Sequence, residues 1–278
     1  MALFTPTAYW GEASTPVPPA FSPADIPNLA GWYDASDTTS YIKSGTSITG
    51  ISSQGNYGDN LGVLGGSNPT SGATQNGLDT LYFNGSTAFE NSSTDPLVSS
   101  GLHFAVGVFY PQSVDDTKDS LWSVDASMDY AISANQSSQW YGEVDLGNGV
   151  GSDGILGPIS TTNRENSWII VTVTFTKIQS QGNYVLFLIN GSTQSSANWY
   201  TTYINNLSTY QKLRIMANRN GNKKQPGRFG ELLLFNGDCG ISNDIYLYRQ
   251  QTEGYLAWKW GLQGNLPSNH PYKNNPPT

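Results

Sequence analysis

Short apolar runs separated by Asn-Gly pairs constrain the fold of this chain most strongly. In the run WIIVTVTFT, Ile169, Val171 and Val173 fall on one face of an extended chain, whereas Thr172 and Thr174 fall on the other. This period of two predicts a β-strand. Asn-Gly pairs begin at positions 76, 84, 148, 190, 220 and 236, and several directly follow such a run. Because Asn-Gly accepts the positive φ of tight turns, the pattern predicts successive antiparallel hairpins.

Similar runs recur along most of the chain. They cover residues 81–83, 103–110, 121–124, 130–133, 139–146, 184–191, 212–218 and 228–236. The run YVLFLING has apolar residues on both faces, which suits a strand buried in the centre of a sheet. About ten short strands with no helix between them predict an all-β sandwich of two sheets.

The amino-acid composition limits the classes of partner that this chain is expected to bind. Charged residues make up 12% of the chain, against about 25% in an average soluble domain, so Ser, Thr, Asn, Gln and Gly must cover much of the surface. Such a surface suits an extracellular or particle-bound protein. The net charge of -8 argues against nucleic acid and anionic membrane as partners. One loop gathers four basic residues, which we interpret as a solvated hairpin: Arg219, Lys223, Lys224 and Arg228.

The single cysteine and the lack of a recognisable targeting signal argue against several further classes of protein. Cys239 is the single cysteine, so neither an intrachain disulfide nor a cysteine-based zinc site is expected. The chain starts without a basic segment followed by an apolar run, and no stretch approaches the roughly 18 apolar residues of a membrane span. We therefore expect neither signal-dependent secretion nor membrane insertion.

Prolines mark both ends of the chain. Ten of the 15 lie in residues 1–27 and 267–278, which predicts an extended N-terminal arm and an extended C-terminal tail around a sandwich at 28–266. The arm also carries five large apolar or aromatic residues, which either wrap its own domain or anchor it to a neighbouring protein: Leu3, Phe4, Tyr9, Trp10 and Phe21.

One segment near the C-terminus has helical periodicity instead. Ser242 can cap its first turn, and Gly261 supplies a stop. Six residues share one face at about 100° per residue: Ile245, Tyr248, Thr252, Tyr255, Leu256 and Trp260. This aromatic stripe indicates a helix packed on the core rather than a ligand platform.

The end of the chain carries a specific resemblance. The strand GRFGELLLFNGD, the helix and the segment EGYLAWKWGLQGNLPSNHPYKNNPP resemble the C-terminal signature of LamG-like domains in the concanavalin A-like lectin and glucanase superfamily. NLAGWYDASDTTS resembles the opening strand of these domains, and LYFNGSTAF and YVLFLINGST resemble two of their hairpins. The resemblance covers about residues 28–272 and implies a jelly-roll β-sandwich in which His270 fixes the tail. Relatives of this kind occur in bacteriophage virion proteins and in large secreted bacterial proteins.

The sequence contains no complete motif for a catalytic site or a metal site. Glucanases of this superfamily have a strand resembling E-x-D-x-x-E, and EVDLGN at 143–148 supplies Glu143 and Asp145 but has Asn148 in the third position. Retaining hydrolysis needs both a nucleophile and an acid, so we expect no catalytic residue. Five acidic residues lack the spacing of a calcium loop: Asp115, Asp116, Asp119, Asp125 and Asp129. No cofactor or metal site is predicted, and structural calcium lacks a specific motif.

Two function classes remain, and they are compatible. The first is a non-enzymatic bacteriophage virion protein, a capsid decoration, head fibre or tail component that is assembled in the host cytoplasm. Its arm would bind capsid or tail proteins, and it could form homo-oligomers. The second is a lectin-like module, extracellular if secreted, that binds glycans through five aromatic residues: Trp140, Tyr141, Trp199, Tyr200 and Tyr203. A third possible function is glycoside hydrolase, but the sequence lacks the general acid that this function needs.

Overall fold

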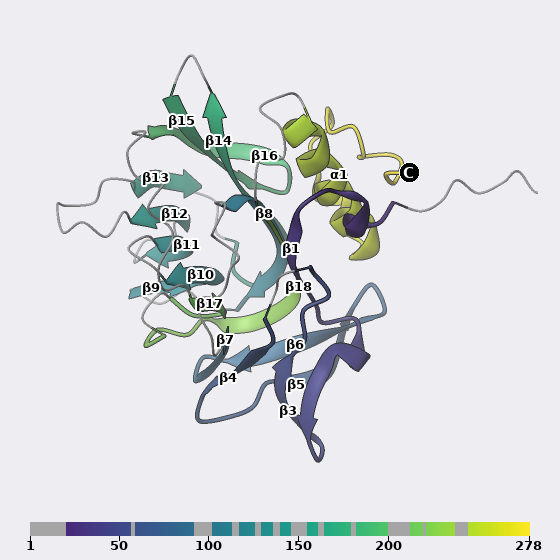
Figure 1. Ribbon diagram of the computed structural model, residues 1–278, viewed down its shortest axis with the longest axis vertical. Helices are drawn as coiled ribbons and strands as arrows, with labels where there is room; N and C mark the ends of the chain where they lie inside the picture. Colours follow the sequence, from purple (N-terminus) through teal and green to yellow (C-terminus); the bar gives the residue numbers. More distant parts are fainter. Residues whose placement is uncertain are drawn as a thin grey trace, which may run out of the picture.

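The computed structural model describes twelve segments of the chain (Figure 1). They are residues 21–56, 59–91, 102–112, 117–125, 129–135, 140–145, 155–160, 164–178, 182–199, 212–218, 221–236 and 244–278. In these segments 18 strands, one α-helix and three short 3-10 helices alternate with turns. The predicted all-β fold is confirmed.

The strands have the following bounds: β1 (Leu29–Asp34), β2 (Tyr41–Ser44), β3 (Ser47–Ile51), β4 (Leu61–Gly65), β5 (Thr70–Gln75), β6 (Leu78–Asn84), β7 (Thr87–Asn91), β8 (Leu102–Pro111), β9 (Thr117–Ser120), β10 (Trp122–Asp125), β11 (Asp129–Asn135), β12 (Trp140–Asp145), β13 (Ile155–Ser160), β14 (Ile169–Ile178), β15 (Gly182–Ile189), β16 (Ser192–Trp199), β17 (Lys212–Ile215) and β18 (Pro226–Asn236). The helix α1 spans Asp244–Lys259, and the 3-10 helices are η1 (Pro23–Asp25), η2 (Thr38–Ser40) and η5 (Gln263–Asn265).

The described strands pair antiparallel into three sheets. Sheet A has the order β16-β15-β14-β8-β18-β6-β5, with β1 added on β18. Sheet B has the order β10-β17-β7-β4-β3-β2, and sheet C has the order β13-β12-β11-β9. Sheet C lies beside sheet B where β11 contacts β10, and β13 contacts β16 of sheet A. Sheets A and B form the two layers of the predicted sandwich.

Two of the predicted Asn-Gly turns have the expected backbone. Asn76 and Gly77 join β5 to β6 with φ of 51° and 76°. Asn190 and Gly191 join β15 to β16 with φ of 51° and 73°. Positive φ at both central positions matches the right-handed twist of the flanking strands, so these pairs close tight hairpins.

The hydrophobic core has two layers, and strand β14 contributes to both. Ile169 and Val171 lie in the cluster between sheets A and B, together with phenylalanines of both sheets. Ile170 lies in the cluster between sheet A and α1. Figure 1 shows α1 on the side of sheet A that faces away from sheet B. The threonine face of β14 is therefore buried too, and Thr172 has no exposed surface.

The predicted helix is confirmed, and its buried face includes Leu256 and Trp260 as expected. The same face also buries Arg249 and Glu253, two charged residues that the aromatic stripe does not include. Gly261 has φ of 70° and ends the helix. Among the described residues, no helix is both long and apolar enough to cross a membrane.

The C-terminal tail differs from the expected extended chain. After η5, the amide of His270 donates to the carbonyl of Pro267, and the amide of Lys273 donates to the carbonyl of His270. These bonds form successive turns that pack on α1. Gly254 lies directly under Tyr272, since a Cβ there would lie 2.5 Å from that of Tyr272. Proline does prevent a ladder here, but side-chain contacts with the helix replace it.

Candidate functional site

The five aromatic residues predicted to bind glycans lie on or after strands of sheets A and C. Trp140 and Tyr141 begin β12, and Trp199 ends β16. Trp140 pairs with Ser160 of β13, and β13 contacts β16. The fold thus brings the backbones of β12 and β16 close to each other through one intervening strand. Their side chains, and residues 200 and 203, lie outside the described residues, so this site stays a prediction.

The glucanase-like strand is also located. Glu143 and Asp145 lie in β12, where Glu143 pairs with Ala131 on one side and Ile155 on the other. The third motif position, 148, lies outside the described residues and carries Asn in the sequence. The strand therefore lacks the last carboxylate of the E-x-D-x-x-E pattern, the position expected to supply the acid.

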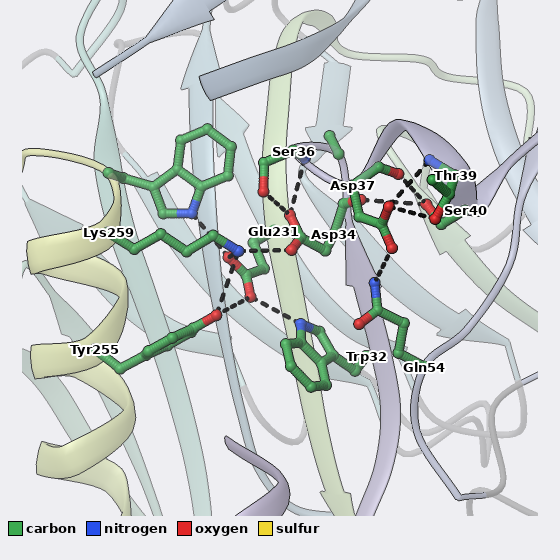
Figure 2. Close-up of polar contacts among 12 residues, drawn as sticks. Trp32, Asp34, Ser36, Asp37, Thr39, Ser40, Gln54, Glu231, Tyr255 and Lys259 are labelled. Atoms are coloured by element: carbon green, nitrogen blue, oxygen red, sulfur yellow. Dashed lines mark hydrogen bonds and ion pairs between the residues drawn. The ribbon is translucent and has the colours of Figure 1, made fainter. Parts of the chain in front are cut away.

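Three carboxylates are buried in the described interior, and the first two, Asp34 and Glu231, form one cluster beneath α1 (Figure 2). The carboxylate of Glu231 on β18 accepts three hydrogen bonds and forms one ion pair within this cluster. Oε1 receives the indole N–H of Trp32 at 2.8 Å and the hydroxyl of Tyr255 at 3.2 Å. Oε2 receives the indole N–H of Trp260 at 2.9 Å and Nζ of Lys259 at 2.7 Å.

Asp34 completes this cluster from β1. Its Oδ2 lies 2.6 Å from Nζ of Lys259, and its Oδ1 accepts bonds from the amide and hydroxyl of Ser36 at 2.8 and 2.7 Å. One ammonium group therefore faces two carboxylates. Burial raises the pKa of Glu231, the neighbouring Asp34 raises it further, and Lys259 opposes both. Burial alone would lower the pKa of Lys259, but Glu231 and Asp34 together raise it.

The third buried carboxylate, Glu253, joins α1 to β14 and to the tail. The hydroxyl of Thr172 donates to Oε1 at 2.8 Å, and Oε2 lies 3.2 Å from Nε2 of His270. Nε of Arg249 lies 3.8 Å from Oε1, one helical turn away. The expectation that His270 fixes the tail agrees with this contact, because the imidazole is buried against the helix.

These clusters are structural in character. Each of the three carboxylates buried in the described interior is held by hydrogen bonds or ion pairs with donors of the same chain. The described residues contain no group of three or more His, Cys, Asp or Glu that could hold a metal ion. Sequence reasoning missed both clusters. The available signal was Lys259, a charged residue that two aromatic residues flank in the sequence of a helix packed on the core. A charge in such a position needs a partner of opposite charge.

The arm is described from Phe21 onward. The Phe21 ring lies 6.1 Å from the ring of Tyr255, in an edge-to-face arrangement, and packs against the cluster between α1 and sheet A. The hydroxyl of Ser22 caps η1, and the amide of Ser22 donates to Oδ2 of Asp25. This end of the arm therefore packs on its own domain. The other four predicted arm residues, Leu3, Phe4, Tyr9 and Trp10, lie outside the described residues.

Comparisons with known proteins bear on the fold. No family model and no curated protein matches the sequence. Domain 4 of AbnA, a GH43 extracellular arabinanase from Geobacillus stearothermophilus in complex with arabinotriose, is similar with a TM-score of 0.53 and 13% identity, over 76% of this chain and 93% of that one.

Two further solved structures superpose less closely. The CBM40 of Ruminococcus gnavus IT-sialidase gives a TM-score of 0.46 and 12% identity, over 61% of this chain and 95% of that one. Trypanosoma rangeli sialidase in complex with DANA gives 0.47 and 11%, over 82% of this chain and 34% of that one. The arabinanase domain shares the β-sandwich fold with this protein.

Proposed function

We propose that this protein is a non-enzymatic, lectin-like β-sandwich that binds saccharides. The observation that carries the proposal is the similarity to domain 4 of AbnA, which extends over 93% of that domain and whose structure is in complex with arabinotriose. The absence of hydrolysis is supported by the EVDLGN segment, which has Asn148 where the glucanase pattern has its last acidic residue.

A binding assay tests this proposal. We expect the purified chain to bind at least one oligosaccharide in a glycan array, with arabinotriose and sialyllactose included, and to release no reducing sugar from it. Trp199→Ala should weaken that binding at least tenfold. Tyr246→Ala is the matched control, since Tyr246 is an aromatic residue of α1 that is 45% exposed. A blank array would contradict the proposal, and equal losses in both variants would reject Trp199 as a contact.

We further propose that the sandwich belongs to a bacteriophage particle as a LamG-like decoration, head fibre or tail component, with residues 1–20 as the anchor to capsid or tail proteins. The resemblance of the EGYLAWKWGL segment to virion proteins supports this, as does the low share of charged residues. Phe21 is already fixed on α1, so the anchor would start immediately before it.

Truncation separates the virion protein from a secreted lectin. Particles assembled with a chain lacking residues 1–20 should lose this protein, whereas Phe21→Ala should retain it and lower only its stability. Retention of the truncated chain on particles would contradict the anchoring role. A full-length chain that never copurifies with particles yet binds glycan would favour the secreted module.

A further inference from the structure

The face of sheet A that α1 covers continues beyond the helix. Val108 on β8 is fully buried in the cluster between α1 and the sheet, and a Cβ on Gly230 of β18 would lie 3.2 Å from the ring of Trp260. Tyr110 and Arg228 lie two residues further along the same two strands, on the same face, and each is partly exposed. The cover that α1 provides therefore ends between these positions.

Four residues form a row across this part of the sheet. The register aligns Thr70 with Tyr82, Tyr82 with Arg228, and Arg228 with Tyr110. These four residues, which we name the Tyr82 row, cross the adjacent strands β5, β6, β18 and β8. Phe83 lies in the core between sheets A and B, so Tyr82 and the residues aligned with it face away from that core. Neighbouring strands lie about 4.8 Å apart, so the row spans roughly 14 Å.

Aromatic rings make up most of the row's surface. Tyr82 and Tyr110 flank Arg228 on either side, and the ring centroid of Tyr110 lies 5.5 Å from that of Trp168, which precedes β14. All three aromatic residues are partly exposed. Tyrosine combines an apolar ring face with a hydroxyl at its edge. A sugar ring has the same combination of C–H groups on its faces and hydroxyls at its edge, so this surface suits a saccharide.

Arg228 is the charged member of the row. It lies in β18, and not in the solvated hairpin that its sequence context predicted. Its guanidinium carbon lies over the Tyr82 ring, 5.8 Å from the centroid, and among the described residues no hydrogen bond or ion pair includes its side chain. Arg214, by contrast, is paired with Glu90. A ring face supplies no acceptor oxygen, so the N–H donors of Arg228 are held in position without an anion.

We infer that the Tyr82 row is a second saccharide site, which binds a sugar that carries a carboxylate. The carboxylate accepts paired hydrogen bonds from Arg228, the geometry for which a guanidinium group is suited. The rings of Tyr82 and Tyr110 contact the sugar, and the exposed Thr70 offers a hydroxyl at the end of the row. One arginine on a chain of net charge -8 suits a single carboxylate better than a polyanion. This inference rests on the proposed saccharide binding and adds a ligand class and a place.

Removal of the guanidinium group tests the site. The probes are sialyllactose and a disaccharide that ends in glucuronic acid, each compared with its methyl ester, which keeps the rings but has no charge. The unmodified chain should bind at least one acid tenfold or more tightly than its ester, and Arg228→Met should abolish this preference. Arg228→Lys keeps the charge but loses the paired geometry, so it should restore only part of the affinity.

Lys43→Met is the matched control. Nζ of Lys43 also lies over a tyrosine ring, 5.5 Å from the centroid of Tyr41, but on β2 of sheet B. This variant should keep the preference for the acid. The melting temperatures of the Arg228 variants should stay close to that of the unmodified chain, because Arg228 has no hydrogen bond or ion pair to lose among the described residues.

Each outcome decides one question. Loss of the acid preference in Arg228→Met with retention in Lys43→Met supports the site, and a preference for one acid alone identifies the source of the carboxylate. If Arg228→Met keeps the preference, the site is wrong while the proposed function stands. If the unmodified chain binds acid and ester equally, or neutral oligosaccharides only, the ligand class is wrong and the proposed function again stands. If it binds no oligosaccharide, both fail.

Discussion

The indole N–H of Trp260 donates to Glu231 Oε2 at 2.9 Å and so joins the end of α1 to the strand β18 beneath it. Lys259, the preceding residue, reaches the same oxygen at 2.7 Å. Two adjacent residues of the KWG sequence therefore saturate one side of a buried carboxylate. Lys259, the last residue of α1, and Trp260 directly after it thus supply two donors for a charge that sheet A buries.

Lys259→Met should be strongly destabilising. The substitution keeps most of the side-chain volume but leaves Glu231 and Asp34 without their common cation. Removing one partner of a buried ion pair costs about 3–5 kcal/mol. Urea unfolding at pH 8 measures the loss. The control is Lys273→Met, which removes an exposed and a part-buried hydrogen bond to the carbonyls of Gly264 and Leu266 but leaves no buried charge unpaired, so it should cost clearly less than Lys259→Met.

The loss in Lys259→Met should shrink in acid. Without Lys259, the folded-state pKa of Glu231 rises further above its ordinary value of 4.5, because burial and Asp34 still raise it. A raised folded-state pKa means that protonation favours the folded chain, and this stabilisation is lost as pH rises through that pKa. The difference in unfolding free energy from the unmodified chain should therefore be smaller at pH 5 than at pH 8. A difference independent of pH would show that Glu231 is not the unpaired charge.

The unmodified chain should lose stability above about pH 10. Burial raises the pKa of Tyr41 and of Tyr255 well above 10.0, and the two carboxylates raise the pKa of Lys259 above 10.5. In all three groups the folded state holds the proton more tightly than the unfolded chain, so their stabilisation is complete below the unfolded-state pKa and declines above it. Urea unfolding should show a nearly constant free energy up to about pH 9.5 and a fall above it, and a profile that stays flat to about pH 11.5 would contradict these shifts.

Thr172→Val should cost about 1.5–3 kcal/mol, the usual contribution of a hydrogen bond to a charged group. Valine has nearly the same shape, but it leaves Oε1 of Glu253 with only the guanidinium of Arg249, 3.8 Å away. Thr172→Ser keeps the hydroxyl and is the matched control. Thermal unfolding should rank the serine variant well above the valine variant; the reverse order would indicate that packing, and not the hydrogen bond, dominates at this position.

Gly261→Ala should destabilise the chain by about 1–2 kcal/mol, the cost of a left-handed backbone for an L-residue. Gly261 has φ of 70°, and a Cβ would lie 3.0 Å from Cγ of Asn76 in the β5–β6 turn. Gly264→Ala provides the control, since a Cβ there meets nothing within 4 Å. Equal melting temperatures for the two variants would contradict the role of Gly261 as the end of the helix.

Local patterns were sufficient to predict most of the regular structure. The alternation at 168–176 predicted β14, the pairs beginning at Asn76 and Asn190 predicted tight hairpins, and the aromatic stripe with Gly261 predicted α1. These are effects of neighbouring residues on backbone conformation, which a single sequence carries directly. The strands β2 and β5 were missed, because each contains too few apolar residues to show a period of two.

The pairing of distant residues was decided by the tertiary structure alone. Glu231 and Lys259 are 28 positions apart, Thr172 and Glu253 are 81 apart, and Tyr82 comes next to Arg228 only through strand register. The alternation of β14 indicated two faces, but only the packing of α1 showed that the threonine face is buried. The sequence by itself determined that this chain folds as β-hairpins closed by a helix. Which charges meet, and which sheet face remains open, depends on contacts between distant segments, since burial decides where a charge needs a partner.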